Sequence, residues 1–200
     1  MRRLPDSIDM DEVLANSYKD FHQKGFDYIC LKRSPFETLK LYFFDGDASK
    51  LPEVVSPHDH RYDFGTTVVA GASENVWFLP DEAGERYNAF AYRTPLNGGD
   101  GFTFTGEARL RETRRKAFQA GQHYHMLAEG LHTIRIVENE TVLFLRQYED
   151  RVPLDRPTQT FIRGDKAPSL DGLYSRFTAD QVVDRLSRFQ ERTGFQFLKR

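Results

Sequence analysis

The sequence has a single cysteine and a single tryptophan among its 200 residues, and it has no long apolar run. A lone cysteine, Cys30, excludes an internal disulfide and is compatible with a reducing compartment. Cys30 lies in the apolar run 28–31, which indicates a buried small side chain rather than a nucleophile. The sequence shows neither a membrane span nor the apolar stretch of a signal peptide. We therefore expect a cytoplasmic protein without a membrane partner.

An excess of charge of one sign is also missing, because 28 Lys and Arg residues stand against 30 Asp and Glu residues. Basic clusters at 109–111 and 114–116 are balanced by acidic residues, which is typical of a solvated strand or loop. The sequence therefore predicts no nucleic-acid partner. It is rich instead in aromatic residues, with 17 Phe and 9 Tyr. Aromatic residues punctuated by glycine favour β structure.

One helix is predicted near each end of the sequence. Residues 7–25 carry apolar side chains on one side at helical spacing, and Gly25 is a natural end. Residues 178–194 begin with a capping-box pattern at Thr178 and end at Gly194. The candidate N-cap residues of the first helix are Asp6, Ser7 and Asp9.

Between the two helices, short β-like runs alternate with turn signals. The predicted strands are residues 26–31, 38–44, 62–69, 73–79, 87–93, 101–104, 107–115, 122–127, 132–137, 141–147 and 160–162. Many short strands at regular spacing are typical of a sandwich or a small barrel. No internal repeat or linker divides the chain, so we predict one domain over residues 1–200. It consists of an N-terminal helix within 1–25, a β-barrel over 26–163 and a C-terminal helix over 178–194.

Three histidines are the strongest candidates for a functional site. His58 and His60 are two residues apart, so on a β-strand they point to the same face. Tyr62 and Phe64 share that parity, and such a stripe is typical of a barrel interior. The alternative is that the two histidines lie in an exposed Pro-rich loop. If His132 joins them from another strand, three imidazoles meet, and neutral imidazole suits Fe, Zn, Cu or Ni rather than Ca or Mg.

The two histidine segments resemble the two motifs of the cupin superfamily. The run His-Asp-His at 58–60 leads to Gly71, as His-x-His leads to a glycine in the first motif. Residues 121–132 resemble the second motif, in which an aromatic-bearing strand and a glycine turn precede a metal-binding histidine, here His132. The resemblance covers about residues 38–148. It implies an all-β dominated, cupin-like barrel (a double-stranded β-helix or jelly roll) with the two helices outside it.

Two departures narrow this resemblance. The first cupin motif usually has Glu three or four residues after its second histidine, but Phe64 and Gly65 stand there. The familiar Pro of the second motif is also missing, since residues 127–130 read Leu-Ala-Glu-Gly. Without the Glu, the pattern is similar to the three-histidine cupins, which include thiol dioxygenases such as cysteine dioxygenase. The Cys–Tyr cross-link often found there has no counterpart in the matching region, because Cys30 lies outside it.

The resemblance implies one divalent transition metal held by His58, His60 and His132, with Fe(II) expected first and Zn, Ni, Cu or Mn as alternatives. It implies an Fe(II) dioxygenase, an oxidoreductase that acts on a small metabolite bearing a carboxylate or a thiol. The alternatives are a non-catalytic small-molecule-binding or sensing cupin, and a sugar isomerase or epimerase in which a histidine acts as a base. Exposed barrel edges also favour a homodimer.

Strand parity assigns roles to residues near the histidines. Tyr62 is the expected proton donor, with Tyr124 as the alternative. His125 is the second expected catalytic residue. It is expected to face the pocket, where it is also an alternative metal ligand, and His123 shares its parity. Asp63 would replace the missing Glu only if a β-bulge turned it inward, and a salt bridge to an arginine is the competing interpretation.

Three further residues are candidates for substrate binding. Arginine holds a carboxylate through two parallel hydrogen bonds, so an arginine facing the cavity would favour an anionic substrate. Arg146 is the first candidate, although the face that it shares with Val142 and Phe144 is either the inner or the outer one. Arg93 and Tyr92 are the others.

Overall fold

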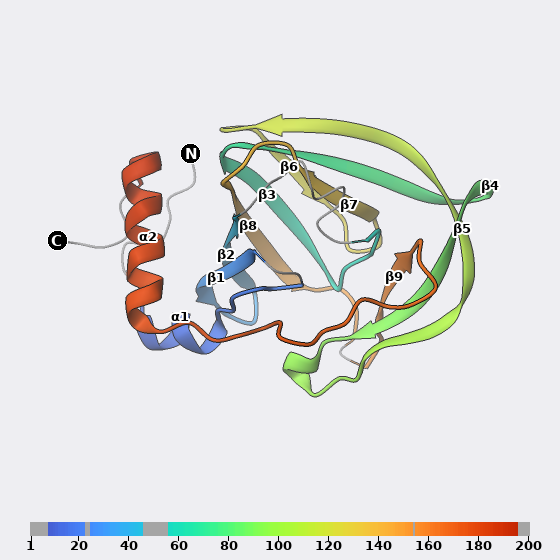
Figure 1. Ribbon diagram of the computed structural model, residues 1–200, viewed down its shortest axis with the longest axis horizontal. Helices are drawn as coiled ribbons and strands as arrows, with labels where there is room; N and C mark the ends of the chain where they lie inside the picture. Colours follow the sequence, from blue (N-terminus) through green and yellow to red (C-terminus); the bar gives the residue numbers. More distant parts are fainter. Residues whose placement is uncertain (1–7, 23–24, 46–55, 154, 196–200) are drawn as a thin grey trace.

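A computed structural model describes residues 8–22, 25–45, 56–153 and 155–195. In these residues two antiparallel β-sheets face one another, and two helices lie beside one of them (Figure 1). The first sheet has the order β1-β2-β8-β3-β6, with bounds β1 Phe26–Arg33, β2 Glu37–Phe44, β8 Thr141–Asp150, β3 Tyr62–Ala70 and β6 His123–Met126. The second has the order β5-β4-β7, with bounds β5 Gly101–Gln119, β4 Ala72–Arg93 and β7 Leu131–Ile136, and β9 Thr158–Ile162 also pairs with β4.

In the described parts of the chain, the helices are α1 Met10–Asn16 and α2 Ala179–Thr193, and a 3₁₀ turn, η2 Pro95–Asn97, follows β4. The prediction of a β-dominated fold of the jelly-roll type, with a helix toward each end, is confirmed. No helix in the described parts of the chain is long and apolar enough to cross a bilayer.

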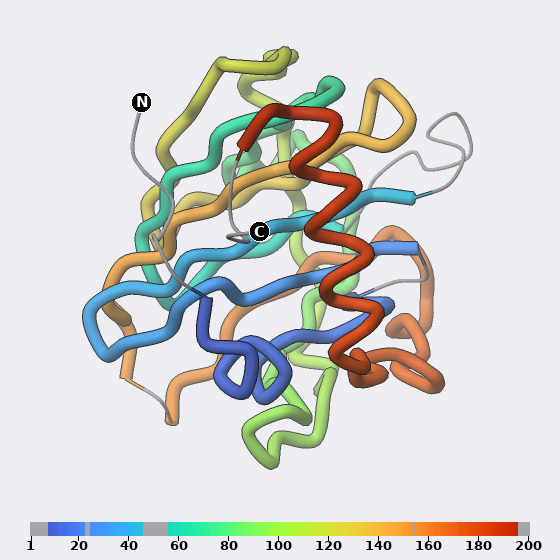
Figure 2. The backbone as a smooth tube through the Cα atoms, turned by 90° about the vertical axis from the view of Figure 1, so that its left-hand side faces the viewer, coloured from blue at the N-terminus to red at the C-terminus, as the bar shows by residue number. Residues whose placement is uncertain are grey.

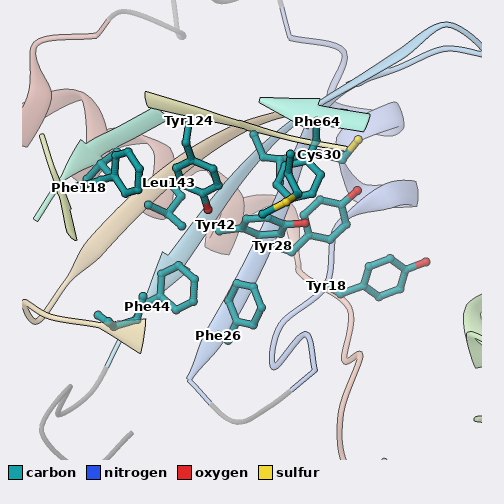
Figure 3. Close-up of a cluster of buried hydrophobic side chains, with 14 residues drawn as sticks. Tyr18, Phe26, Tyr28, Cys30, Tyr42, Phe44, Phe64, Phe118, Tyr124 and Leu143 are labelled. Atoms are coloured by element: carbon teal, nitrogen blue, oxygen red, sulfur yellow. The ribbon is translucent and has the colours of Figure 1, made fainter. Parts of the chain in front are cut away.

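Side chains at every second strand position fill the space between the two sheets. Along β3 the deeply buried positions alternate with less buried ones, as expected of a strand with one core-facing side. The resulting core is largely aromatic and takes residues from both sheets (Figure 3). Its members include Tyr28, Cys30, Tyr42, Phe64, Phe118, Tyr124 and Leu143. Cys30 is fully buried among them, which confirms its interpretation as a core residue, and burial raises the pKa of its thiol.

The outer face of the first sheet is covered by the two helices, and α2 crosses it in Figure 2. α2 buries Val182, Leu186 and Phe189, whose spacing places them on one side of a helix. They pack against residues of β1 and β2 that include Ile29 and Leu41. Because both faces of these strands are covered, β1 and β2 are buried along most of their length.

The first helix is shorter than predicted. α1 begins after the N-cap Asp9, and it ends at Asn16. The chain then pairs with β1, because the N–H of Tyr18 donates to the carbonyl of Tyr28 at 2.9 Å and the reverse bond measures 2.8 Å. Strand pairing takes over the backbone hydrogen bonds that a longer helix would use. The prediction of a helix up to Gly25 is therefore wrong.

The second helix follows its prediction closely. The hydroxyl of Thr178 accepts from the N–H of Gln181, whose side chain accepts in return from the N–H of Thr178, so the predicted capping box is present. Gly194 ends the helix with a φ of 73°, a conformation that glycine adopts at little cost. The other candidate caps of the first helix, Asp6 and Ser7, lie outside the described residues.

In two places, a pair of strands predicted as separate forms one continuous strand in the structure. Residues 73–79 and 87–93 both belong to β4, and residues 101–104 and 107–115 both belong to β5. At the interruption of β4, Pro80 and Glu85 both pair with Leu110. The residues between them therefore bulge out without reversing the chain, and the strand continues on the other side.

Candidate metal centre

His58 and His60 lie in the segment that leads into β3, and backbone hydrogen bonds tie this segment to the second sheet. The N–H of His58 donates to the carbonyl of His132 at 3.0 Å, and the reverse bond measures 3.1 Å. The N–H of His60 donates to the carbonyl of Ala128 at 2.8 Å, in the turn before β7. Residues distant in the sequence are thus fixed side by side.

The three imidazoles converge as the sequence predicts. One ring nitrogen from each of His58, His60 and His132 lies within 4.8 Å of the other two. The ring centroids of His58 and His60 are 4.6 Å apart, and that of His132 lies 5.2 Å and 5.0 Å from them. Among the described residues, this is the group of potential ligand side chains that could hold a metal ion.

Hydrogen bonds outside the cluster leave ring nitrogens free to face its centre. The Nδ1 of His58 is 2.8 Å from the carbonyl oxygen of Ser56, which only accepts, so Nδ1 carries the proton and Nε2 holds a lone pair. The Nδ1 of His132 is 2.5 Å from the Oδ1 of Asn75, which fixes the same tautomer. Asn75 is fully buried on β4.

Two ring nitrogens at the cluster are buried and have no hydrogen-bond partner within the described part of the chain: the Nε2 of His132 and the Nδ1 of His60. Buried polar atoms without a partner are uncommon in proteins, because each one loses its hydration. A metal ion would supply the missing partner. The residues therefore fit a divalent transition metal, both in donor type and in their unpaired nitrogens.

All three rings are held neutral, which is the form that binds metal. Burial, followed by repulsion from His58 and then from His132, holds the pKa of His60 well below its usual range. Burial and then His58 do the same to the pKa of His132. Burial also lowers the pKa of His58, although its hydrogen bond to the Ser56 carbonyl opposes this.

The stripe predicted beside the histidines faces the same interior. The ring of Tyr62 lies 5.8 Å from that of His60, and its hydroxyl lies 3.5 Å from the Nζ of Lys40. The ring of Phe64 lies 4.6 Å from His60 and 5.7 Å from His132, and Phe64 belongs to the core between the sheets. The cluster therefore has an apolar side at Phe64 and a polar side at Tyr62.

The prediction that His125 faces the pocket is wrong. β6 pairs with β3 so that His125 stands opposite Gly65 and Tyr124 opposite Thr66. Residues paired across an antiparallel sheet share a face, and on β3 it is Thr66 that is buried. His125 is accordingly exposed and lies 5.9 Å from the ring of Tyr148, whereas Tyr124 is buried in the core. His123 is exposed as well.

The predicted role of Arg146 is also wrong, because its side chain lies on the outer face. It shares that face with Val142 and Phe144, which pack with the helices. Its guanidinium forms an ion pair with Glu37, with Nη2 2.7 Å from Oε2, and stacks over the ring of Tyr148. The helices cover the face of β8 that carries Arg146, so this face does not line the histidine cluster.

The two remaining substrate-binding candidates lie at the far end of β4. Arg93 is exposed and donates to the carbonyl of Asp155 at 2.8 Å, so the structure gives it no contact with the histidines. The hydroxyl of Tyr92 lies 2.9 Å from that of Tyr174, which in turn lies 3.5 Å from the Nδ1 of His22. Tyr92 is therefore linked to His22 rather than to the three-histidine cluster directly.

Neither aspartate next to the histidines turns toward them. Asp63 accepts from the N–H of Ala128 at 2.9 Å and pairs with Arg151 at 3.1 Å, so the salt-bridge interpretation is confirmed. Asp59 accepts from the N–H of Gln159 at 2.6 Å. Both carboxylates fix the backbone of the segment around the histidines and leave the cluster without an acidic ligand from this segment.

The sequence analysis gave no role to three residues near the cluster: Asn75, Lys40 and His22. The sequence does contain an indication for Asn75 and Lys40, since each is a polar residue at a core-facing position of a strand. Asn75 has the parity of Trp77, which pairs with His132, and Lys40 has the parity of Tyr42. His22 carries no such signal, because its position follows from the unexpected end of α1. Burial, followed by His58 and Lys40, lowers the pKa of His22 to about 3.

Comparison with known proteins gives similarity to solved structures alone, since no family model and no curated protein matches this chain. KdgF from Halomonas sp. is 16% identical over 64% of this chain and 82% of its own, with a TM-score of 0.37. The Fe(II) form of HppE is 11% identical over 74% of this chain and 65% of its own, with a TM-score of 0.42. A cupin superfamily protein from Desulfitobacterium hafniense is 14% identical over 74% of this chain and all of its own, with a TM-score of 0.38. Two further similar structures, from Shewanella frigidimarina and Ralstonia eutropha, are described as RmlC-like cupins, at 12% and 11% identity with TM-scores of 0.39 and 0.38 over 75% and 92% of this chain and 96% and 88% of their own.

Proposed function

We propose that this protein is a metal-dependent enzyme of the three-histidine cupin type, an Fe(II) dioxygenase that acts on a small metabolite. The observation that carries the proposal is the convergence of His58, His60 and His132, with a buried, unpartnered nitrogen on two of the rings. Two of these rings are oriented by hydrogen bonds that their Nδ1–H groups donate to the carbonyl of Ser56 and the amide oxygen of Asn75, an arrangement common for metal-binding histidines.

The chain itself would hold the ion, orient the substrate and limit access of water. Three neutral ligands leave several coordination positions for other molecules, and a bound Fe(II) ion would supply the chemistry that activates O2. Phe64 and the aromatic core beneath it provide a dry wall on one side of the cluster. On the other side, the ring of Tyr62 lies 5.8 Å from that of His60, which supports a role for its hydroxyl as proton donor to a bound ligand.

Elemental analysis tests the metal site. The protein is purified without affinity-tag metals and compared with His58→Ala, His132→Ala and the matched control His125→Ala, which removes an exposed imidazole. We expect about one equivalent of a divalent transition metal in the wild type and in His125→Ala, and a loss of most of it in the other two. Equal metal content in all four proteins would refute the site.

An oxygen electrode tests the reaction class. Fe(II)-loaded protein is supplied with small carboxylates and thiols, and His132→Ala serves as the control. We expect substrate-dependent O2 uptake by the wild type alone. If the wild type retains iron but never exceeds the control, and ligands raise its melting temperature without turnover, the protein is a binding cupin and the dioxygenase proposal is wrong.

A further inference from the structure

One cation is buried beside the three histidines. Lys40 lies on β2, where it pairs with Cys30 of β1 and Leu145 of β8, both core residues of the interior. It shares the parity of Tyr42, another member of that core. Only 7% of its surface is exposed. The ammonium group therefore ends between the two sheets and not in solvent.

The surroundings of this ammonium group are aromatic. Its Nζ lies 5.3 Å from the ring centroid of Tyr28 and 5.1 Å from that of Tyr62. Its hydrogen-bond partner is the hydroxyl of Tyr62, at a long 3.5 Å. No carboxylate of the described residues pairs with it, whereas Lys32 on the neighbouring strand is paired with Glu37 at 3.3 Å. Ring faces and one weak hydrogen bond compensate an ammonium ion only in part for lost hydration.

The metal centre makes the shortage of negative charge more severe. The three imidazoles are neutral, so a bound divalent ion keeps its full charge, and Lys40 adds another positive charge on the same interior. The nearby carboxylates, Asp59 and Asp63, are directed to backbone N–H groups and to Arg151. In an interior of low dielectric constant, like charges of this kind repel strongly unless an anion lies between them.

We infer that Lys40 is the anchor of the substrate and that the substrate is a carboxylate-bearing anion. The inference rests on the proposed metal centre, because the anion is placed between the ion and the ammonium group. The Nζ of Lys40 and the hydroxyl of Tyr62 are close enough to donate to one carboxylate group. Charge-assisted hydrogen bonds of this type are short and strong. A neutral substrate would leave the ammonium ion unpaired and is selected against.

The residue inferred to bind the substrate carboxylate differs from the one predicted from the sequence. The sequence favours Arg146 as the carboxylate-binding residue, but this side chain points away from the cluster and is already paired with Glu37. Arg146 pairs with Leu39 on β2, so both side chains lie on the outer face of the sheet. Lys40 is the next residue, and its side chain therefore points to the inner face. The cationic anchor that we infer is therefore Lys40 on the inner face of the sheet, and not Arg146 on its outer face.

Calorimetric titration with acetate tests this inference, with acetamide as its neutral isostere. Wild type, Lys40→Met and the matched control Lys32→Met are compared after metal loading. We expect the dissociation constant for acetate to rise about tenfold or more in Lys40→Met and to stay within about twofold in Lys32→Met. We expect acetamide to bind more weakly than acetate to the wild type. Lys40→Gln replaces Lys40→Met if the latter does not fold.

The inference is overturned if acetate binds wild type and Lys40→Met equally, if acetamide matches acetate on the wild type, or if the wild type binds no acetate at all. Elemental analysis of the same samples separates this failure from failure of the metal site. A wild type that holds metal but shows no dependence on Lys40 contradicts the anchor alone. A wild type that holds no metal but still binds acetate through Lys40 contradicts the proposed function and leaves the anion site in place.

Discussion

The pattern His-x-His occurs twice in this chain, and the two copies have opposite environments. His58 and His60 face the interior, where their rings meet His132 and Phe64. His123 and His125 are exposed on the edge strand β6. The spacing ensures that both rings of a copy share one face, but the neighbouring strand decides which face it is. One copy is therefore suited to bind a metal ion, and the other remains on the surface.

The first comparison removes each copy in turn. In the wild type, free metal at about 100 times its dissociation constant should stabilise the folded protein by about 2.7 kcal/mol. The double variant His58→Ala/His60→Ala should lose this gain completely, whereas His123→Ala/His125→Ala should keep it. Denaturant unfolding with and without metal measures both. Equal gains in the two double variants would show that the interior copy is not the metal site.

A second comparison tests the face assignment on β6 without any metal. Met126 is buried in the core between the sheets, and its neighbour Leu127 is 51% exposed. Met126→Ala should lower the free energy of unfolding by about 2–5 kcal/mol. Leu127→Ala should change it by no more than about 0.5 kcal/mol. If the two costs were similar, or reversed, the assignment of His125 to the exposed face would be wrong.

A third comparison concerns the buried amide that orients His132. Asn75→Ala removes the acceptor that fixes the Nδ1 proton of this ring and should lower metal affinity about tenfold to hundredfold. Asn88→Ala is the matched control, since that amide donates to the carbonyl of Gly164 on the exposed side of β4. Competition with a metal-binding dye measures both affinities. Unchanged affinity in Asn75→Ala would mean that the ring is held by packing alone.

Strand parity explains where the sequence was informative about the site. It predicts that the side chains of His58, His60, Tyr62 and Phe64 face one interior, and they do so although the two histidines precede β3 and the pairing of β3 with β8 shifts register between Tyr62 and Phe64. Strand parity does not extend across a turn. Residues 127–130 form a turn between β6 and β7, so the face of His132 on β7 does not determine the face of His125 on β6. It also fails for Arg146, since a strand covered on both faces has no solvent side to distinguish.

The remaining parts of the site depend on contacts between distant segments. Asn75 matters only because β4 pairs with β7, and Lys40 only because β2 lies near the segment that carries Tyr62. The position of His22 follows from strand pairing at Tyr18, which ends α1 early. The fold class follows from local patterns of apolar residues and turns, whereas these neighbours are set by tertiary structure that no short window of sequence contains.

The smallest effect is expected from His22, an imidazole near the metal site that is not placed among the ligands. Its pKa is about 3 in the folded protein, against about 6.5 in an unfolded chain. As the pH falls below about 6.5, the unfolded chain binds a proton that folded His22 does not, so the free energy of unfolding decreases toward pH 3 and is fully retained above pH 6.5. In metal-free protein, His22→Gln should flatten this decline. Identical pH profiles for His22→Gln and wild type, measured by urea unfolding between about pH 4 and pH 7, would mean that His22 is as open to solvent as the exposed copy on β6.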